Sequence, residues 1–214
     1  MKLPPRFKVC CIQSFEEAQL AIAHGASALG LVAAMPTGPG VIEEDLIRHI
    51  ATRVPPPVAT FLLSSLTDDA LLVEQIRYCA CSTVQLCDRT TAAARERIRK
   101  YAPAVRIVQV VHITGPESVK EAKEAARASD ALLLDSGNRQ HKELGGTGRA
   151  HDWALSRKIV QAAQIPVFLA GGLNASNARQ ALDAVKPFAL DLCSGLRTNG
   201  QLDALKLRAF AEAL

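Results

Sequence analysis

The strongest constraint on the fold is a pattern that repeats along the whole chain. Short apolar runs alternate with longer Ala-rich segments flanked by charges, at a spacing of about 25 residues, and eight such units fit into the 214 residues. Most of the runs are continuously apolar, as parallel strands buried on both faces are. The pattern predicts strands at residues 7–10, 28–32, 58–62, 83–86, 106–111, 131–134, 167–169 and 188–192.

Helix signals fill the gaps between the predicted strands. Ser14 and Glu17 have the spacing of a capping box, in which the hydroxyl caps the first turn and the glutamate closes it. Gly25 follows this first helix, where glycine takes a left-handed conformation, and three prolines at 55–57 end the second. The remaining helices are predicted to start at Glu43, Thr67, Thr91, Pro116, His151, Asn174 and Gln201.

This alternation predicts one α/β domain over residues 1–214, a single (β/α)8 TIM barrel. The alternative is a doubly wound open sheet, which uses the same unit but usually has fewer strands at this length. No low-complexity linker divides the chain. In a barrel the chemistry belongs at the C-terminal ends of the strands, so the residues directly after each apolar run are the candidates for a functional site.

Composition narrows the classes of function. With 49% hydrophobic and 21% charged residues, the chain is not intrinsically disordered. The net charge of +4 is spread along the sequence and aromatic residues make up 4%, which disfavours a nucleic-acid partner. No run of about 18 apolar residues occurs and the start does not resemble a secretion signal, so we expect no membrane partner and a cytoplasmic location.

The six cysteines predict reduced thiols, because disulfide frameworks belong to short secreted domains. Cys10 and Cys11 are adjacent, and Cys79 and Cys81 are separated by one residue. Neither pair has the Cys-x-x-Cys spacing of a structural zinc site. We therefore expect no metal site.

Two glycine-containing turns follow the last two predicted strands. Gly171 and Gly172 come after the seventh strand, and Ser194 and Gly195 come after the eighth. Barrels commonly hold a phosphate at these two positions, where glycine lets backbone amides approach the anion. Either turn alone is better explained by tight chain reversal. Together, the two turns predict a phosphate site and hence a phosphorylated small-molecule partner.

A third glycine-rich stretch, which contains Gly145 and Gly146, follows the sixth strand. Its glycines suit a loop that closes over a substrate and excludes water. The alternative is a flexible surface connection.

Two reactive side chains stand at predicted strand ends. Asp135 directly follows the apolar run at 131–134, a position that suits a general acid. Cys10 ends the first strand, where its thiol is a candidate base. The alternatives are a capping aspartate and an inert, buried cysteine.

In combination these stretches resemble the phosphoribosylanthranilate isomerase family, the barrel enzymes of the tryptophan pathway. The resemblance spans nearly the whole chain in order. It is carried by Lys8-Val9-Cys10, Val84-Gln85-Leu86, Leu133-Leu134-Asp135-Ser136, Gly145-Gly146-Thr147-Gly148 with Asp152-Trp153, Leu169-Ala170-Gly171-Gly172-Leu173-Asn174 and Asp191-Leu192-Cys193-Ser194-Gly195.

The resemblance implies an intramolecular aldose–ketose (Amadori) isomerase that needs no cofactor and acts on an N-linked phosphoribosyl aromatic amine. Carried over by position, Asp135 is the general acid that opens the ribose ring, and the Cys10 thiolate is the base that removes the C2 proton. The phosphate then lies at the two glycine turns.

The chain departs from the family pattern at positions expected to face the aromatic group. Gly40 stands where the family has an arginine near the anthranilate carboxylate, and Cys11 replaces a glycine. Arg197, or Arg6, is a candidate replacement for the missing cation. The other departures are Leu63 for an asparagine, Cys87-Asp88 for His-Gly, and Leu196-Arg197 for Val-Glu.

These departures leave two alternatives beside the isomerase. One is a divergent barrel that acts on another phosphorylated aldose or aminoaldose. The other is a non-catalytic protein that binds a phosphorylated metabolite. The presence of Cys10 and Asp135 favours an enzyme, whereas Gly40 predicts weak activity on a substrate that carries the anthranilate carboxylate.

Overall fold

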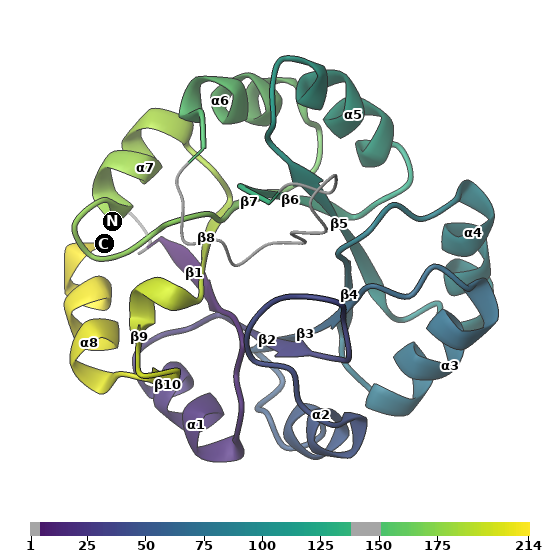
Figure 1. The fold of residues 1–214 in the computed structure, drawn as a ribbon, viewed down its shortest axis with the longest axis horizontal. Helices are drawn as coiled ribbons and strands as arrows, with labels where there is room; N and C mark the ends of the chain where they lie inside the picture. The colour runs from purple at the N-terminus through teal and green to yellow at the C-terminus, as the bar shows by residue number, and fades with distance from the viewer. Residues whose placement is uncertain (1–4, 138–150) are drawn as a thin grey trace.

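Eight parallel strands close into a barrel in chain order in the computed structural model, which describes residues 5–137 and 151–214. Figure 1 looks along the barrel, with the strands at the centre and the helices around them. The predicted barrel is confirmed, and the open sheet is wrong, because the first strand pairs with the last. The strands are β1 (Arg6–Val9), β2 (Ala28–Val32), β3 (Ala59–Ser64), β4 (Thr83–Leu86), β5 (Arg106–His112), β6 (Ala131–Asp135), β7 (Val167–Leu169) and β8 (Ala189–Leu192).

A helix follows each strand and covers the outside of the barrel. Ser14 caps the first helix by accepting a hydrogen bond from the amide of Glu17 at 3.2 Å, as its spacing predicts. Gly25 has the expected left-handed backbone, with φ at +90°. The helices are α1 (Phe15–Ala23), α2 (Glu44–Ala51), α3 (Asp69–Cys79), α4 (Ala92–Tyr101), α5 (Glu117–Ala126), α6 (Trp153–Ala162), α7 (Ala178–Val185) and α8 (Ala204–Ala213).

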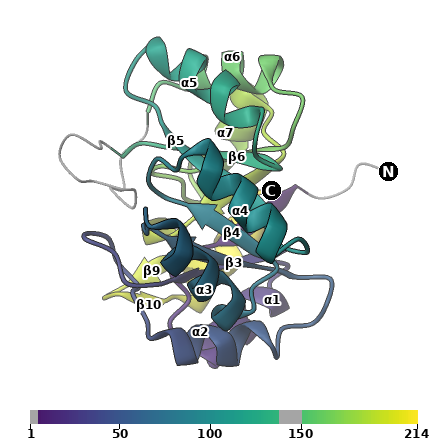
Figure 2. The ribbon, with the colours of Figure 1, turned by 90° about the vertical axis from the view of Figure 1, so that its right-hand side faces the viewer.

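Two helix starts differ from the prediction by more than two residues. The start predicted at Asn174 falls at Ala178, because Asn174 and Asn177 bond to each other in the turn that precedes α7. The start predicted at Gln201 falls at Ala204, because residues 201–202 form a short strand, β10 (Gln201–Leu202), which pairs with β9 (Arg197–Thr198). Figure 2 shows this β9–β10 hairpin at one end of the barrel.

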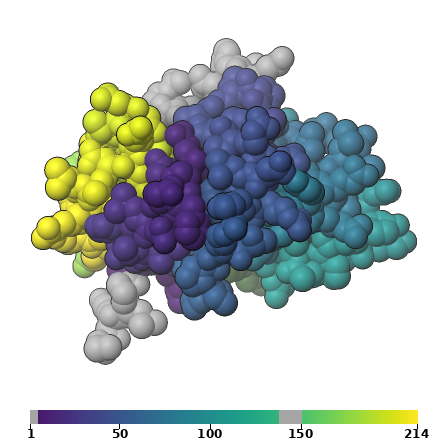
Figure 3. Space-filling view, turned by 90° about the horizontal axis from the view of Figure 1, so that it is seen from below, coloured from purple at the N-terminus to yellow at the C-terminus, as the bar shows by residue number. Residues whose placement is uncertain are grey.

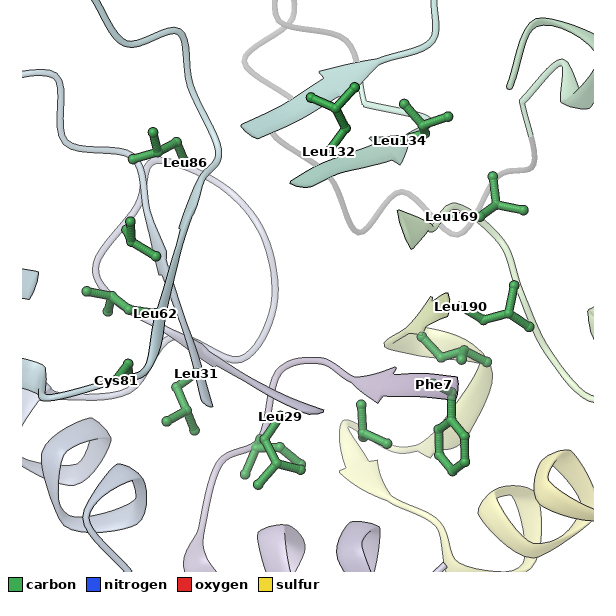
Figure 4. Close-up of a cluster of buried hydrophobic side chains, with 14 of the residues drawn as sticks. Phe7, Leu29, Leu31, Leu62, Cys81, Leu86, Leu132, Leu134, Leu169 and Leu190 are labelled. Atoms are coloured by element: carbon green, nitrogen blue, oxygen red, sulfur yellow. The ribbon is translucent and has the colours of Figure 1, made fainter. Parts of the chain in front are cut away.

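Alternation along the strands produces two apolar layers. Side chains on the outer faces of the strands pack against the helices, and Figure 4 shows members of this layer such as Phe7, Leu29 and Leu132. Side chains on the inner faces fill the barrel. There the rings of Phe61 and Phe168 pack edge to face, with their centroids 5.5 Å apart. Burying a leucine or phenylalanine in this way stabilises the fold by roughly 1.5–3 kcal/mol each.

The two ends of the sequence complete the helix ring. In Figure 3 the C-terminal segment, in yellow, lies beside the N-terminal segment, in purple. The ring of Phe7 on β1 packs edge to face on Phe210 of α8, with the centroids 5.2 Å apart. Within the described residues, no helix is long and apolar enough to cross a membrane.

Candidate active site

A pocket opens at the C-terminal ends of the strands, where the barrel fold predicts the site. It gathers five of the residues selected from the sequence: Cys10, Asp135, Gly171, Gly172 and Ser194. Its wall also includes Cys11, Val32, Met35, Thr37, Gly38, Pro39, Leu63, Gln85, Cys87, Ala170, Leu173, Asp191, Leu192 and Cys193.

Cys10 follows β1 and is 7% exposed, with its amide bonded to the carbonyl of Leu192 at 2.7 Å. Two residues earlier on the same inner face, Lys8 is completely buried. Its ammonium donates to Asp191 Oδ1 at 2.8 Å. Burial by itself lowers the pKa of Lys8, but the carboxylate of Asp191 and the nearby Cys10 outweigh it and raise the pKa above the usual range.

Gly30 on β2 makes room for this arrangement. A Cβ added at Gly30 would lie 2.9 Å from Cys10 Sγ and 3.0 Å from Lys8 Nζ. Because both atoms lie within about 3 Å of the same position, the sulfur of Cys10 and the ammonium of Lys8 are neighbours. Lys8 thus places a positive charge beside the sulfur of Cys10.

Asp135 ends β6 and reaches the pocket from another part of the rim, since β7 and β8 separate β6 from β1. The residue is 8% exposed. Its Oδ1 accepts a hydrogen bond from the amide of Ser136 at 2.7 Å, which fixes the direction of the carboxyl group. A carboxyl group and a thiol thus line one pocket from separate strands.

The turn after β7 lines the pocket with two glycines. Gly171 and Gly172 have left-handed backbones, with φ at +86° and +64°. Asn177 fixes the turn by donating to the carbonyl of Gly172 at 2.9 Å and by accepting from the amide of Asn174 at 2.9 Å. Within the described part of the chain, the amides of Gly171 and Gly172 have no protein acceptor. Free amides of this kind are suited to binding an anion.

The turn after β8 lies directly against the turn after β7. Ser194 starts the short 3-10 helix η2 (Ser194–Leu196). A Cβ added at Gly195 would lie 2.0 Å from the carbonyl oxygen of Leu173, closer than any side chain fits. Gly195 is therefore needed for the two turns to touch. The sequence-based reason, that glycine lets a phosphate approach, is not required to explain it.

Arg197 has its guanidinium in an ion pair on the rim of the barrel. Its Nη1 and Nη2 donate to the two carboxylate oxygens of Glu17 at 3.0 and 2.9 Å. It also donates to the carbonyls of Cys10, Cys11 and Gly200. The pocket wall does not include Arg197, which is 8% exposed.

This ion pair also changes the role predicted for Glu17. A capping box requires Glu17 to bond the amide of Ser14, but its carboxylate accepts from the amides of Gln13 and Leu202, at 3.0 and 2.8 Å. Burial favours the neutral form of Glu17, and the guanidinium of Arg197 overcomes this and lowers its pKa. The pair joins β1, α1 and the β9–β10 hairpin.

Gly40 and Cys11, two departures from the family pattern, are in contact. A Cβ added at Gly40 would lie 2.4 Å from Cys11 Cβ, and Gly40 has a left-handed backbone with φ at +78°. The side chain of Cys11 thus occupies the space beside position 40. Where the resemblance implies a glycine and then an arginine, this chain has a side chain at the first position and none at the second.

Other expected site residues lie elsewhere. Arg6 begins β1 at the opposite end of the barrel, with its guanidinium 4.7 Å from the centre of the Phe188 ring. Gly145 and Gly146 lie outside the described residues. Among the described residues, no arginine, lysine or histidine lines the pocket.

Sequence reasoning did not select three polar residues that belong to this region: Lys8, Asp191 and Gln85. Lys8 and Asp191 interrupt otherwise apolar strands at inward positions, and this is the signal that could have identified them. Gln85 lines the pocket with its Oε1 buried and without a protein partner in the described residues. Such an amide is available to bind a substrate group.

Comparison with known proteins agrees with this geometry. The model of the N-(5'-phosphoribosyl)anthranilate (PRA) isomerase family matches residues 7–213. The chain is 33% identical over 207 residues to N-(5'-phosphoribosyl)anthranilate isomerase 2 of Methanosarcina mazei, covering 96% of this chain and 92% of the relative.

Solved structures give the same result. The phosphoribosyl anthranilate isomerase of Thermus thermophilus superposes with a TM-score of 0.83 at 28% identity, over 97% of both chains. Another isomerase of this name, in complex with reduced 1-(o-carboxyphenylamino)-1-deoxyribulose 5-phosphate, superposes with a TM-score of 0.78 at 25% identity, over 98% of this chain and 97% of that one. The family match over nearly all of the chain, together with the barrel and its pocket, shows that this chain is an isomerase of the N-(5'-phosphoribosyl)anthranilate isomerase family.

Proposed function

We propose that the chain converts an N-(5'-phosphoribosyl) arylamine into the corresponding 1-arylamino-1-deoxyribulose 5-phosphate. The observation that carries the proposal is that Cys10, Asp135 and the two glycine turns line one pocket. The proposal assigns an acid, a base and a phosphate site to these groups. A solved relative of the same fold binds a reduced form of such a ketose phosphate.

The reaction begins with Asp135. In its protonated form it donates a proton to the ribose ring oxygen, the bond between that oxygen and C1 breaks, and the amine nitrogen and C1 form a Schiff base. The amide of Ser136 bonds Oδ1 at 2.7 Å and so helps to orient the carboxyl group. A positioned acid of this kind contributes roughly 10²–10⁴-fold to the rate.

Cys10 performs the second step. Its thiolate removes the proton from C2, and the electron pair of that C–H bond forms the enol-amine, which becomes the ketone by tautomerisation. The ammonium of Lys8, held by Asp191 at 2.8 Å, lies beside the sulfur and stabilises its negative charge before the proton is taken. Lys8 is thus a positioning residue that acts through Cys10.

The phosphate binds at the turns after β7 and β8. The amides of Gly171 and Gly172 face the pocket without a protein acceptor in the described residues, and Ser194 adds a hydroxyl from the neighbouring turn. Backbone amides at these positions of a barrel are suited to a phosphate group. The anion holds the sugar so that C1 and C2 lie between Asp135 and Cys10.

The aromatic group is the part of the substrate that the described residues specify least. The relatives are named for anthranilate, which carries a carboxylate. No cation among the described residues lines the pocket, so we expect a relative preference for an arylamine without that carboxylate. A different phosphorylated aminoaldose is the second candidate, and it is favoured by the same observation.

Two measurements test the proposal. Expression of the chain in a tryptophan-requiring strain that lacks this isomerase tests the family reaction, and growth is the expected result. Turnover of phosphoribosylanthranilate and of its decarboxylated analogue by the purified protein tests substrate choice. Absence of turnover on both, together with a thermal shift by ribose 5-phosphate, would show that the chain is a non-catalytic binding protein.

A further inference from the structure

Two thiols meet in the wall of the pocket. Cys11 follows β1 and Cys193 follows β8, and these two strands are paired in the barrel. Their sulfur atoms are 2.8 Å apart and share a hydrogen bond. Both cysteines are free thiols, and both line the pocket. Formation of a bond between them requires only a small approach of the two sulfurs.

The backbone holds Cys11 in a conformation that cysteine rarely adopts. Its φ is +62°, in the left-handed region that costs a residue with a side chain roughly 1–2 kcal/mol. Because Gly40 has no side chain, the Cβ of Cys11 has room beside it. Such strain persists where the surroundings fix it, and it gathers at functional sites.

The two thiols differ in reactivity. The hydrogen bond with Cys11 and the charge of Arg197 lower the pKa of Cys193, although burial opposes them. Contacts with Cys10 and with Cys193, together with burial, raise the pKa of Cys11. Cys193 is also the more exposed of the two. One member of the pair is therefore suited to attack an oxidant, and the other is suited to complete a disulfide.

We propose that Cys11 and Cys193 form a hydroperoxide-reactive dithiol that closes to a reversible disulfide in the wall of the pocket. The Cys193 thiolate attacks one peroxide oxygen, the O–O bond breaks, and the leaving hydroxide takes a proton to become water. The Cys11 sulfur then displaces hydroxide from the resulting sulfenic acid, and the thiol proton leaves with it as a second water. Two thiols are oxidised to one disulfide, and one hydrogen peroxide is reduced to two waters.

The bridge would act on the site from both sides. Cys11 directly follows Cys10, and Cys193 directly precedes Ser194. Closing the disulfide therefore moves the backbone next to the proposed base and next to the proposed phosphate turn. Because displacements of about 1 Å in such groups cost up to about 10²-fold in rate, we expect the oxidised protein to turn over at least about tenfold more slowly. This part of the inference rests on the proposed function.

The bridge itself is tested without any activity measurement. The reduced full-length protein is treated with equimolar hydrogen peroxide, its remaining thiols are alkylated, and its tryptic peptides are mapped without reduction. The peptide that carries Cys193 contains no other cysteine, whereas Cys10 and Cys11 share one peptide. We expect these two peptides to be linked, and the link to disappear on reduction. Alkylation without a link in the wild type would overturn the proposal.

Variants identify the partner of Cys193. The link is expected to survive Cys10→Ser and to be lost in Cys11→Ser and Cys193→Ser. A link that persists in Cys11→Ser would show that Cys10 is the partner instead, and would overturn the assignment. Cys79 and Cys81 are an internal control, since burial raises the pKa of each to about 12 and they are expected to stay reduced.

Turnover provides the second measurement. The wild type is expected to lose at least about tenfold in kcat after peroxide treatment and to regain it with dithiothreitol, whereas Cys11→Ser shows no reversible loss relative to its own untreated rate. A linked wild type with unchanged kcat would refute the effect on the site. If no substrate is turned over at all, the proposed function fails, and the peptide map still decides the disulfide.

Discussion

The two sides of the pocket differ in how closely they follow the family pattern. The side built from β1 and from β6 to β8 carries Asp135 and Cys10, the proposed acid and base, and the glycine turns. The side built from β2 to β4 carries Gly40, Leu63 and Cys87, where the family has an arginine, an asparagine and a histidine. The first side holds the sugar phosphate in the proposed reaction, and the second faces the aromatic group. In this proposal, the reaction and the recognition of the aromatic group are carried by separate strands.

The largest expected effect tests the first side. We expect Cys10→Ser and Asp135→Asn each to lower kcat by at least about 10²-fold, the scale of a lost acid or base. Steady-state kinetics measures the effect, and thermal unfolding checks that each variant remains folded. Near-native turnover in either folded variant would remove that residue from the mechanism and contradict the role proposed for the first side.

The second prediction tests whether Arg197 stabilises the fold through its ion pair with Glu17 or instead contributes to binding of the aromatic group. Both side chains are largely buried, at 6% and 14% exposure, so Glu17→Gln leaves a buried guanidinium without its counter-ion. We expect a loss of about 2–3 kcal/mol in unfolding free energy at pH 7, somewhat below the cost of breaking a fully buried pair. Chemical denaturation of the wild type and the variant measures the difference.

The pH dependence of this effect follows from the lowered pKa of Glu17. Its folded pKa lies below the ordinary value of 4.5, so the stabilisation is fully present above that value and is lost as the pH falls through the folded pKa. We expect the gap between wild type and Glu17→Gln to narrow below pH 4.5. If Arg197→Ala instead left stability intact and lowered activity only on the carboxylated substrate, Arg197 would serve the aromatic side.

The contact between Gly40 and Cys11 gives a way to change the second side. A single Gly40→Arg substitution places its Cβ 2.4 Å from Cys11 Cβ, so we expect it to destabilise the fold without improving catalysis. In the double variant Cys11→Gly/Gly40→Arg, the clash with the Cys11 side chain is gone, and the backbone at position 40 must shift to relieve the remaining 2.9 Å approach of its Cβ to the Cα of residue 11. A charged hydrogen bond to the carboxylate contributes about 1.5–3 kcal/mol, which is roughly 10- to 150-fold in kcat/KM.

This gain is expected for phosphoribosylanthranilate and not for its decarboxylated analogue. Cys11→Gly alone is the matched control, because it removes the side chain and adds no cation. Equal gains on both substrates would show that position 40 does not recognise the carboxylate. Equal gains in Cys11→Gly and in the double variant would show the same.

The sequence was sufficient for the barrel and for the residues at the strand ends. Continuous apolar runs at regular spacing define parallel strands, and a barrel then brings Cys10, Asp135 and Gly171 to one rim although they are far apart in the chain. A strand that is buried on both faces has a continuously apolar sequence, so a single sequence is enough to identify it. These are the parts of the site that local pattern and topology together determine.

The contacts between loops were not accessible from the sequence. The pairing of Arg197 with Glu17 depends on the β9–β10 hairpin, whose strands are two residues each and carry no periodic signal. The contacts of Cys11 with Gly40 and with Cys193 depend on left-handed backbone at a non-glycine residue. Such conformations are imposed by tertiary packing and not by local propensity, and here they decide which side chains reach the pocket.

The smallest expected effect separates backbone strain from anion binding at the glycine turns. Gly172 and Gly200 both have left-handed backbones, with φ at +64° and +80°, but Gly172 lines the pocket and Gly200 lies in the β9–β10 turn. Alanine at either position is expected to cost about 1–2 kcal/mol of stability, because its Cβ is strained there. Only Gly172→Ala adds a methyl group to a residue that lines the pocket, so only this variant should bind ribose 5-phosphate more weakly. Titration calorimetry of both variants measures the affinities, and denaturation measures the matched loss of stability. Equal affinities in Gly172→Ala and Gly200→Ala would show that the turn after β7 reverses the chain without holding the phosphate, and the anion would then have to bind at amides other than those of the β7 turn.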